Sequence, residues 1–185
     1  MSNLSGKERN MTDIISVCRQ EIPAMRFIGI EYGEEDRKDG NYSEKWLQWH
    51  RNGLFDRIRN AAGGSDVCHE LYEDGDACVG LMRTKRGEPF RYWIGMFVPK
   101  GTAVPDEFDY LDFPEADLGA VRVTGKEDET TDREKDCLFE LGRAGLEAIK
   151  DSEGAWWCLE RYGCPGYAGP DEKGNVILDI CYFIR

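Results

Sequence analysis

The sequence predicts an α+β protein that is built from two similar halves. Three observations indicate this fold class. Segments rich in β-branched and aromatic residues recur along the chain, bounded by Gly, Pro or Asp, as is typical of β-strands. Two other stretches place apolar residues three and four positions apart, which is typical of helices that bury one face. The order of these segments is strand, helix, strand, strand, and it occurs twice.

The first half contains a strand, a long helix and two further strands. The helix follows a charged loop, begins with Ser43 as its cap and ends at Gly63-Gly64. Gly53 lies inside it and costs about 1 kcal/mol relative to Ala, so we expect a kink there. The apolar face of this helix is formed by Trp46, Leu47, His50, Leu54, Ile58 and Ala61. The four elements are predicted at residues 24–32, 43–62, 67–73 and 90–98.

The second half repeats this order. Its helix is predicted to begin at Thr131, where Thr131 and Glu134 have the spacing of a capping box that satisfies two free backbone amides. The buried stripe of this helix is predicted to be Leu138, Leu141, Gly145, Ala148 and Ile149. The three strands of this half are predicted at residues 118–123, 156–162 and 176–184.

Length and polarity set the expected domain limits. The chain has 185 residues, enough for one domain or for two small halves that share a core. The first 24 residues are polar and are predicted to form an N-terminal arm. The remainder, 25–185, is predicted to be one domain whose halves span about 25–100 and 106–185.

The charge balance excludes one large class of function. The chain has 24 Lys and Arg residues and 36 Asp and Glu residues, a net charge of −12. We therefore expect no nucleic-acid partner, because phosphate contacts need clustered cations. No segment has the roughly 20 apolar residues that span a bilayer, and the N-terminus lacks a secretion signal, so no membrane partner and a cytoplasmic location are expected. The seven cysteines include no Cys-x-x-Cys pair, which favours free thiols and no metal site.

A short pattern, Cys-x-Glu-x-Tyr, occurs once in each half. It is found at Cys68 to Tyr72 and again at Cys158 to Tyr162, an offset of 158 − 68 = 90 residues. If both copies are strands, Glu70 and Glu160 each share a face with a cysteine and a tyrosine, because side chains alternate. A carboxylate on a covered face must be paired, protonated or used for a ligand.

Aromatic residues on the predicted strands that close the two halves complete a candidate pocket. Aromatic walls around one or two carboxylates suit a flat, apolar or cationic organic molecule. The candidate ligand-binding residues are the aromatics Tyr92, Trp93, Trp157 and Tyr162 together with Asp179. Tyr92 and Trp93 point opposite ways in a regular strand, so at most one of them is expected at the pocket unless the strand bulges. The alternatives are that these rings are core, that an arginine pairs with Glu160, and that Glu70 lies at a solvated edge.

Five motifs of the chain also carry a family resemblance. They are Tyr92-Trp-Ile-Gly-Met-Phe97, residues 101–110, Glu160-Arg-Tyr162, Cys164-Pro165 and residues 170–179. Together they resemble the GyrI-like small-molecule-binding family, also known as the effector-binding domain of AraC- and MerR-type transcription regulators. The resemblance runs from about Met25 to Ile184. One departure is Gly166, where the similar subgroup commonly has an arginine after Cys-Pro.

The resemblance implies a fold and two candidate functions. The implied fold is a duplicated βαββ unit (an SH2-like motif) with pseudo-twofold symmetry, antiparallel sheets, two main helices and a ligand groove between the halves. About 24 residues precede Met25, too few for a DNA-binding domain, so we expect a stand-alone member. Such members include cyclopropanoid cyclopropyl hydrolases, and Glu160, Tyr92 and Trp93 match the family motifs.

As an enzyme, the protein would use Glu160 to activate a water that opens a strained ring. Glu70 or Asp179 would orient this water, and no cofactor is required. As a binding module, it would hold an aromatic, hydrophobic or cationic small molecule without chemistry. The sequence does not predict the oligomeric state.

Overall fold

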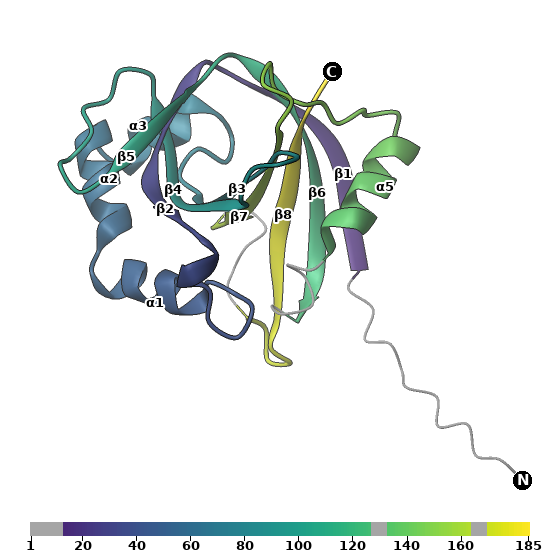
Figure 1. The fold of residues 1–185 in the computed structure, drawn as a ribbon, viewed down its shortest axis with the longest axis horizontal. Helices are drawn as coiled ribbons and strands as arrows, with labels where there is room; N and C mark the ends of the chain where they lie inside the picture. The colour runs from purple at the N-terminus through teal and green to yellow at the C-terminus, as the bar shows by residue number, and fades with distance from the viewer. Residues whose placement is uncertain (1–12, 127–132, 164–169) are drawn as a thin grey trace, which may run out of the picture.

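One antiparallel sheet of eight strands organises the parts of the chain that the computed structural model describes, residues 13–126, 133–163 and 170–185 (Figure 1). Across the sheet the strand order is β1-β6-β8-β7-β3-β4-β2-β5. In chain order the strands are β1 (Asp13–Ile22), β2 (Met25–Tyr32), β3 (Cys78–Thr84), β4 (Arg91–Pro99), β5 (Asp109–Phe113), β6 (Ala116–Lys126), β7 (Trp156–Tyr162) and β8 (Asn175–Ile184). The predicted α+β class is confirmed.

The helices fall into two groups along the sheet (Figure 1). A short 3₁₀ helix (Glu34–Asp36) and then α1 (Ser43–Arg51), α2 (Leu54–Ala62) and α3 (Ser65–Leu71) follow β2, whereas α5 (Glu134–Arg143) follows β6. α2 and α3 contact β4, and α5 contacts β6. None of the helices in the described part of the chain is long and apolar enough to cross a lipid bilayer.

The strand order divides the sheet into two groups of three strands. In the first half, β2, β3 and β4 lie in the order β3-β4-β2, and in the second half β6, β7 and β8 lie in the order β7-β8-β6. β3 and β7 join the halves at the centre of the sheet. Each half thus has a strand, helical segment, strand, strand arrangement, as predicted, and the pseudo-twofold symmetry between the halves stays a prediction.

The predicted N-terminal arm is wrong over residues 13–22, which form the edge strand β1 along β6. A bulge between Ile14 and Ser16 explains the error. Ile14 lies opposite Val123 and Val17 lies opposite Val121, so both pack against the same core although they are three positions apart. The extra residue, Ile15, is 51% exposed. Because of this spacing, β1 lacks the regular alternation of apolar and polar residues by which a strand is recognised in a sequence.

The strand predicted at residues 67–73 is also wrong. Gly63 and Gly64 have φ angles of 100° and 117° and end α2, after which Ser65 begins the separate helix α3. The strand of the first half that pairs with β7 is β3, in which Cys78 lies opposite Tyr162 and Gly80 opposite Glu160. The two Cys-x-Glu-x-Tyr matches therefore relate a helix to a strand, and their 90-residue offset does not relate equivalent elements.

The expected interruption of the first long helix occurs at Gly53. This residue has φ = +62°, a left-handed conformation that favours glycine, and it separates α1 from α2. The buried side chains of the two helices are Trp49, Phe55 and Ile58. Of the predicted apolar face, Leu47 is instead 56% exposed and His50 is exposed.

The second helix is shorter than predicted. Its described part, α5, begins at Glu134 and ends before Gly145, which has φ = +76°. Cys137 and Leu141 face the core, whereas Ala148 and Ile149 lie beyond the helix and pair with the end of β8. Thr131, the predicted cap, lies outside the described residues.

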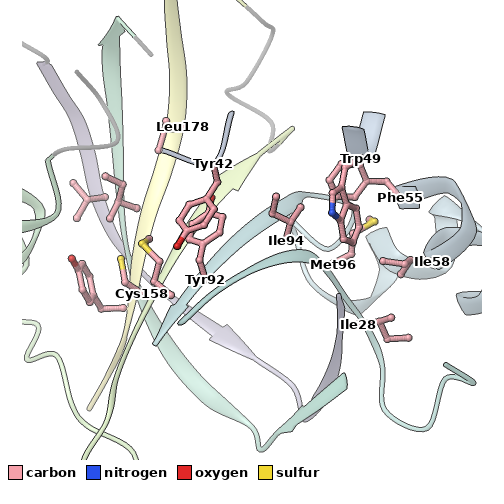
Figure 2. Packing of buried hydrophobic residues seen from close by; sticks show 14 of the residues in the cluster. Ile28, Tyr42, Trp49, Phe55, Ile58, Tyr92, Ile94, Met96, Cys158 and Leu178 are labelled. Atoms are coloured by element: carbon pink, nitrogen blue, oxygen red, sulfur yellow. The ribbon is translucent and has the colours of Figure 1, made fainter. Parts of the chain in front are cut away.

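The sheet buries both of its faces. The cluster on the helix side includes Trp49, Phe55 and Ile58, packed near Ile28 and Met96, as Figure 2 shows. A second cluster on the opposite face includes Phe27, Trp93, Phe97 and Leu159. Strands at the centre therefore need apolar residues on both sides, which explains the uninterrupted apolar run of β4.

Candidate functional site

Glu160 lies at the centre of the sheet, where the two halves meet. It is on β7, between Gly80 of β3 and Ile180 of β8, and it is only 5% exposed. Cys158 and Tyr162 share its face, as the alternation of strand side chains requires. A carboxylate buried to this degree costs free energy unless polar groups or a bound cation compensate for it.

Tyr92 of β4 supplies one of these polar groups. Its hydroxyl donates a hydrogen bond to Glu160 Oε2 at 3.2 Å and accepts one from Trp46 Nε1 of α1 at 2.9 Å. Burial and the neighbouring Glu160 carboxylate raise the pKa of Tyr92 well above its ordinary value. The phenol therefore stays protonated and remains a donor to the carboxylate.

Gly80 leaves the space in which this hydrogen bond forms. A Cβ atom at Gly80 would lie 2.4 Å from the Tyr92 hydroxyl oxygen and 3.1 Å from Glu160 Oε2. β3 lies between β4 and β7, so the pair reaches across the strand that separates them. Only a residue without a side chain at this position allows that contact.

Aromatic rings enclose the Tyr92–Glu160 pair. Tyr42, at the start of α1, stacks on Tyr92 with ring centroids 4.2 Å apart and an interplanar angle of 2°. Figure 2 shows these two rings lying face to face, near Cys158. Trp46 packs edge-on against Tyr162 with centroids 4.8 Å apart. We call Glu160, Tyr92, Tyr42, Trp46 and Tyr162 the Glu160 cluster.

The other predicted ligand-binding residues lie on the opposite face of the sheet. Trp93 and Trp157 belong to the second core cluster, and the Trp157 indole donates a hydrogen bond to Asp151. Of the Tyr92 and Trp93 pair, only Tyr92 reaches the Glu160 cluster, as the strand geometry predicts. The Trp93 Nε1 atom is buried and has no hydrogen-bond partner in the described part of the chain.

Asp179 also lies on that opposite face, in a buried ion-pair network. Its carboxylate accepts hydrogen bonds from Arg161 at 2.9 Å and from Arg122 at 2.8 Å and 3.0 Å. Arg161 also pairs with Asp74 at 3.0 Å and donates to Gln20 of β1. Burial alone would raise the pKa of Asp179, but these arginines outweigh it and lower the pKa. We call these residues the Arg161 network.

Glu70 is exposed on α3 rather than facing a pocket from a strand. The structure thus brings Glu160, Tyr92 and Tyr162 together and leaves Glu70, Trp93, Trp157 and Asp179 elsewhere. Among the described residues, no group of three or more His, Cys, Asp or Glu side chains has the arrangement of a metal site.

Sequence reasoning missed the roles of three residues that form or shape this site. Trp46 was predicted only as part of a buried helical face, and its indole N–H is instead a donor within the site. Tyr42 precedes the predicted helix cap, and no pattern in the sequence marks it. Gly80 lies in β3, the strand that was not predicted.

Comparisons with protein families and with curated proteins give no match. Solved structures do match. One is SAV2435 bound to tetraphenylphosphonium, with a TM-score of 0.61, 12% identity, and coverage of 92% of this chain and 94% of that one. Another is the EcmrR C-terminal domain, with a TM-score of 0.55, 10% identity, and coverage of 92% and 97%. A third is a hydrolase from Listeria innocua, with a TM-score of 0.52, 9% identity, and coverage of 92% of each chain.

At such low identity the likeness shows a shared fold. That fold agrees in its α+β class and antiparallel strands with the fold expected from the GyrI-like resemblance, over nearly the whole chain.

Proposed function

We propose that this protein binds cationic small molecules that carry planar aromatic rings at the Glu160 cluster. The observation that carries the proposal is the placement of the Glu160 carboxylate, 5% exposed and enclosed by stacked and edge-on aromatic rings. A carboxylate in such surroundings attracts a cation strongly, because the local dielectric constant is below that of water. Aromatic faces add cation–π attraction and stacking.

Tyr92 makes the site selective for charge. Because its pKa is raised, the phenol stays neutral at physiological pH, donates a hydrogen bond to Glu160 and adds no second negative charge beside it. A cationic ligand would complement the Glu160 carboxylate at this position. An anionic ligand would be repelled in the same position.

Tyr42 indicates how one planar ring of the ligand would be held. Its ring lies parallel to that of Tyr92 at stacking distance, and its hydroxyl is anchored to the Gly33 carbonyl at 3.1 Å. A ligand ring that replaced the Tyr42 ring would stack on Tyr92 in the same way. The cost of moving Tyr42 is offset when the ligand ring takes over these contacts.

The comparison with SAV2435 supports this ligand class. That protein has the same fold at a TM-score of 0.61 and binds tetraphenylphosphonium, a cation that carries aryl groups. The shared fold makes the corresponding ligand class a reasonable first probe for this chain.

Hydrolysis of a strained, electrophilic cyclopropanoid compound is the second candidate function. The observation that favours it is the Tyr92 hydrogen bond, which would orient Glu160 as a general base. A water would give a proton to Glu160 while its oxygen bonds to a cyclopropane carbon. The ring C–C bond would break, its electrons would move into the conjugated carbonyl group, and Glu160 would return the proton to the resulting oxyanion.

Two further points bear on the hydrolase candidate. The similarity to a Listeria innocua hydrolase supports it at the level of the fold. Glu70 and Asp179 do not support it as helpers of Glu160, because Glu70 is exposed on α3 and Asp179 is tied up in the Arg161 network. Binding is therefore the function that the geometry supports best.

The test is a titration of the protein with tetraphenylphosphonium by calorimetry. We expect saturable binding that Glu160→Gln weakens at least about tenfold, equal to about 1.4 kcal/mol. The matched control is Glu70→Gln, which makes the same change at an exposed carboxylate and should bind as the wild type does. Absence of binding, or equal binding by Glu160→Gln, would contradict the proposal. Mass spectrometry after incubation with a cyclopropanoid alkylator decides the hydrolase candidate, since turnover adds one water to the compound.

A further inference from the structure

A cavity of about 250 Å³ lies beside the Glu160 cluster, between α1, α2 and the start of β3. Trp49, His50 and Phe55 supply aromatic walls, and Cys78 lies at its β3 side. The ring centroids of Trp49 and His50 lie 4.8 Å and 5.1 Å from that of Phe55. His50 is exposed, so this wall of the cavity reaches the surface.

The size of the cavity limits what it can hold. An apolar cavity of about 150 Å³ is large enough to bind benzene, whereas pockets for whole drug-sized ligands measure about 300–1,000 Å³. At about 250 Å³, this cavity accommodates one aryl ring and not an entire multi-ring compound. Its occupant is therefore one part of a larger molecule or a single small ring.

The charged residues of the cavity indicate that this part is uncharged. Arg59 lines the cavity, but its guanidinium pairs with Asp76 at 2.7 Å and Asp56 at 3.1 Å. It also contacts the Cys78 sulfur at 3.8 Å. Because the two carboxylates already compensate the guanidinium, the cavity does not require an anion. Its aromatic walls favour a neutral ring.

Trp46 links the cavity to the Glu160 cluster. Its ring contacts Phe55 and His50 of the cavity, at centroid distances of 5.8 Å and 6.3 Å. The same ring contacts Tyr162 and donates to Tyr92 in the Glu160 cluster. Cys78 is also the direct cross-strand neighbour of Tyr162. A molecule whose first aryl group takes the place of the Tyr42 ring would therefore reach the cavity with a second aryl group once Trp46 moves aside.

We propose that this cavity is a second subsite of the ligand site, which takes one neutral aryl group of a cation whose charged part lies at Glu160. The proposal rests on the proposed function and extends it, because it selects cations that carry two or more aryl groups over those that carry one. The break at Gly53 creates the subsite, since it turns α2 away from α1 and places Phe55 opposite Trp49.

The test compares two cations that differ in the number of rings. Tetraphenylphosphonium has several aryl groups, and phenyltrimethylammonium has one. Cys78→Leu fills the cavity, and we expect it to weaken tetraphenylphosphonium binding at least about tenfold while phenyltrimethylammonium binding changes less than about twofold. The matched control is Cys18→Leu, the same change at an exposed position on β1.

A second variant covers the case in which Cys78→Leu does not fold. His50→Ala removes an exposed cavity wall, and we expect it to weaken tetraphenylphosphonium binding more than phenyltrimethylammonium binding. Wild-type binding of both cations, with neither variant separating them, would overturn the subsite and leave the proposed function intact. Failure of the wild type to bind either cation would overturn the proposed function and the subsite with it.

Discussion

The hydroxyl oxygen of Tyr92 lies 3.2 Å from Glu160 Oε2, although the two residues are 68 positions apart in the sequence. The contact crosses from β4 in the first half to β7 in the second, over Gly80 of the intervening β3. It is a polar contact between the two halves at the centre of the sheet. Two substitutions, at Tyr92 and at Gly80, test how much it contributes to stability.

Tyr92→Phe is expected to destabilise the fold by about 1–3 kcal/mol, because it removes a buried hydroxyl that both donates to Glu160 and accepts from Trp46. The measurement is the free energy of unfolding from denaturant titration. The matched control is Tyr110→Phe, because the Tyr110 side chain on β5 is exposed, and this substitution should change stability little. Equal stability of the Tyr92 variant and the wild type would contradict this role.

Gly80→Ala is expected to separate Tyr92 from Glu160, since the added Cβ would lie 2.4 Å from the Tyr92 hydroxyl oxygen. Forcing a methyl group into this packed site should cost about 1–3 kcal/mol of stability and weaken cation binding. Gly142→Ala in α5 is the control, because its Cβ would meet nothing within 4 Å. If Gly80→Ala behaves like this control, the space above Gly80 is not needed.

Arg161→Met is expected to cost about 3–5 kcal/mol of stability, because it leaves the buried carboxylates of Asp74 and Asp179 without the guanidinium that joins them. Arg161 is 1% exposed. Arg185→Met breaks an ion pair with Glu147 that lies at the surface, and it should have no measurable effect. The comparison of the two unfolding curves is the measurement.

Acid should weaken the fold through Asp179. Its pKa lies below the ordinary value of 3.8, so its contribution to stability is complete above that pH and is lost as the pH falls through the lower, folded-state pKa. We expect the stability difference between wild type and Asp179→Asn to shrink as the pH falls from 5 toward 2. A difference that stays constant over this range would show that the Asp179 charge adds no stability.

Thiol labelling should follow burial. Cys18 is exposed, whereas Cys137, Cys158 and Cys181 are buried. Desolvation raises the pKa of Cys137 to about 12 and that of Cys158 well above its ordinary value, which leaves little reactive thiolate. Peptide mapping after brief iodoacetamide treatment at pH 8 should find Cys18 modified before these three. Rapid labelling of Cys158 would indicate that the core opens.

The parts of the fold that were predictable have strong local signals. β7 was predicted with its observed bounds, and Gly53 marked the break between α1 and α2. β1 was missed because its bulge disrupts the alternation of Ile14 and Val17, and α3 was mistaken for a strand because seven residues are too few to show a helical period. Such short elements are decided by tertiary packing rather than by local pattern.

The candidate site was predictable only at its centre. Glu160 and Tyr162 share a face by strand alternation alone, but the choice between Tyr92 and Trp93 depends on the register of β4 against β3. The same alternation places Trp157, three positions before Glu160, and Asp179, next to Ile180 opposite Glu160, on the other face. Tyr42 and Trp46 arrive from the helical side, and nothing in the strand sequences indicates them.

The exchange of edge strands makes the two halves inseparable. β1 precedes the strands of the first half but completes the sheet beside β6, and β5 precedes β6 but completes the sheet beside β2. A half expressed by itself would contain the edge strand that pairs with the other half and would lack the edge strand that pairs with its own sheet. The unpaired backbone N–H and C=O groups at that edge would favour aggregation. The chain is thus expected to unfold in one cooperative transition. It is also expected to fold slowly, because β1 and β5 can pair with their neighbours only after segments far apart in the sequence have come together.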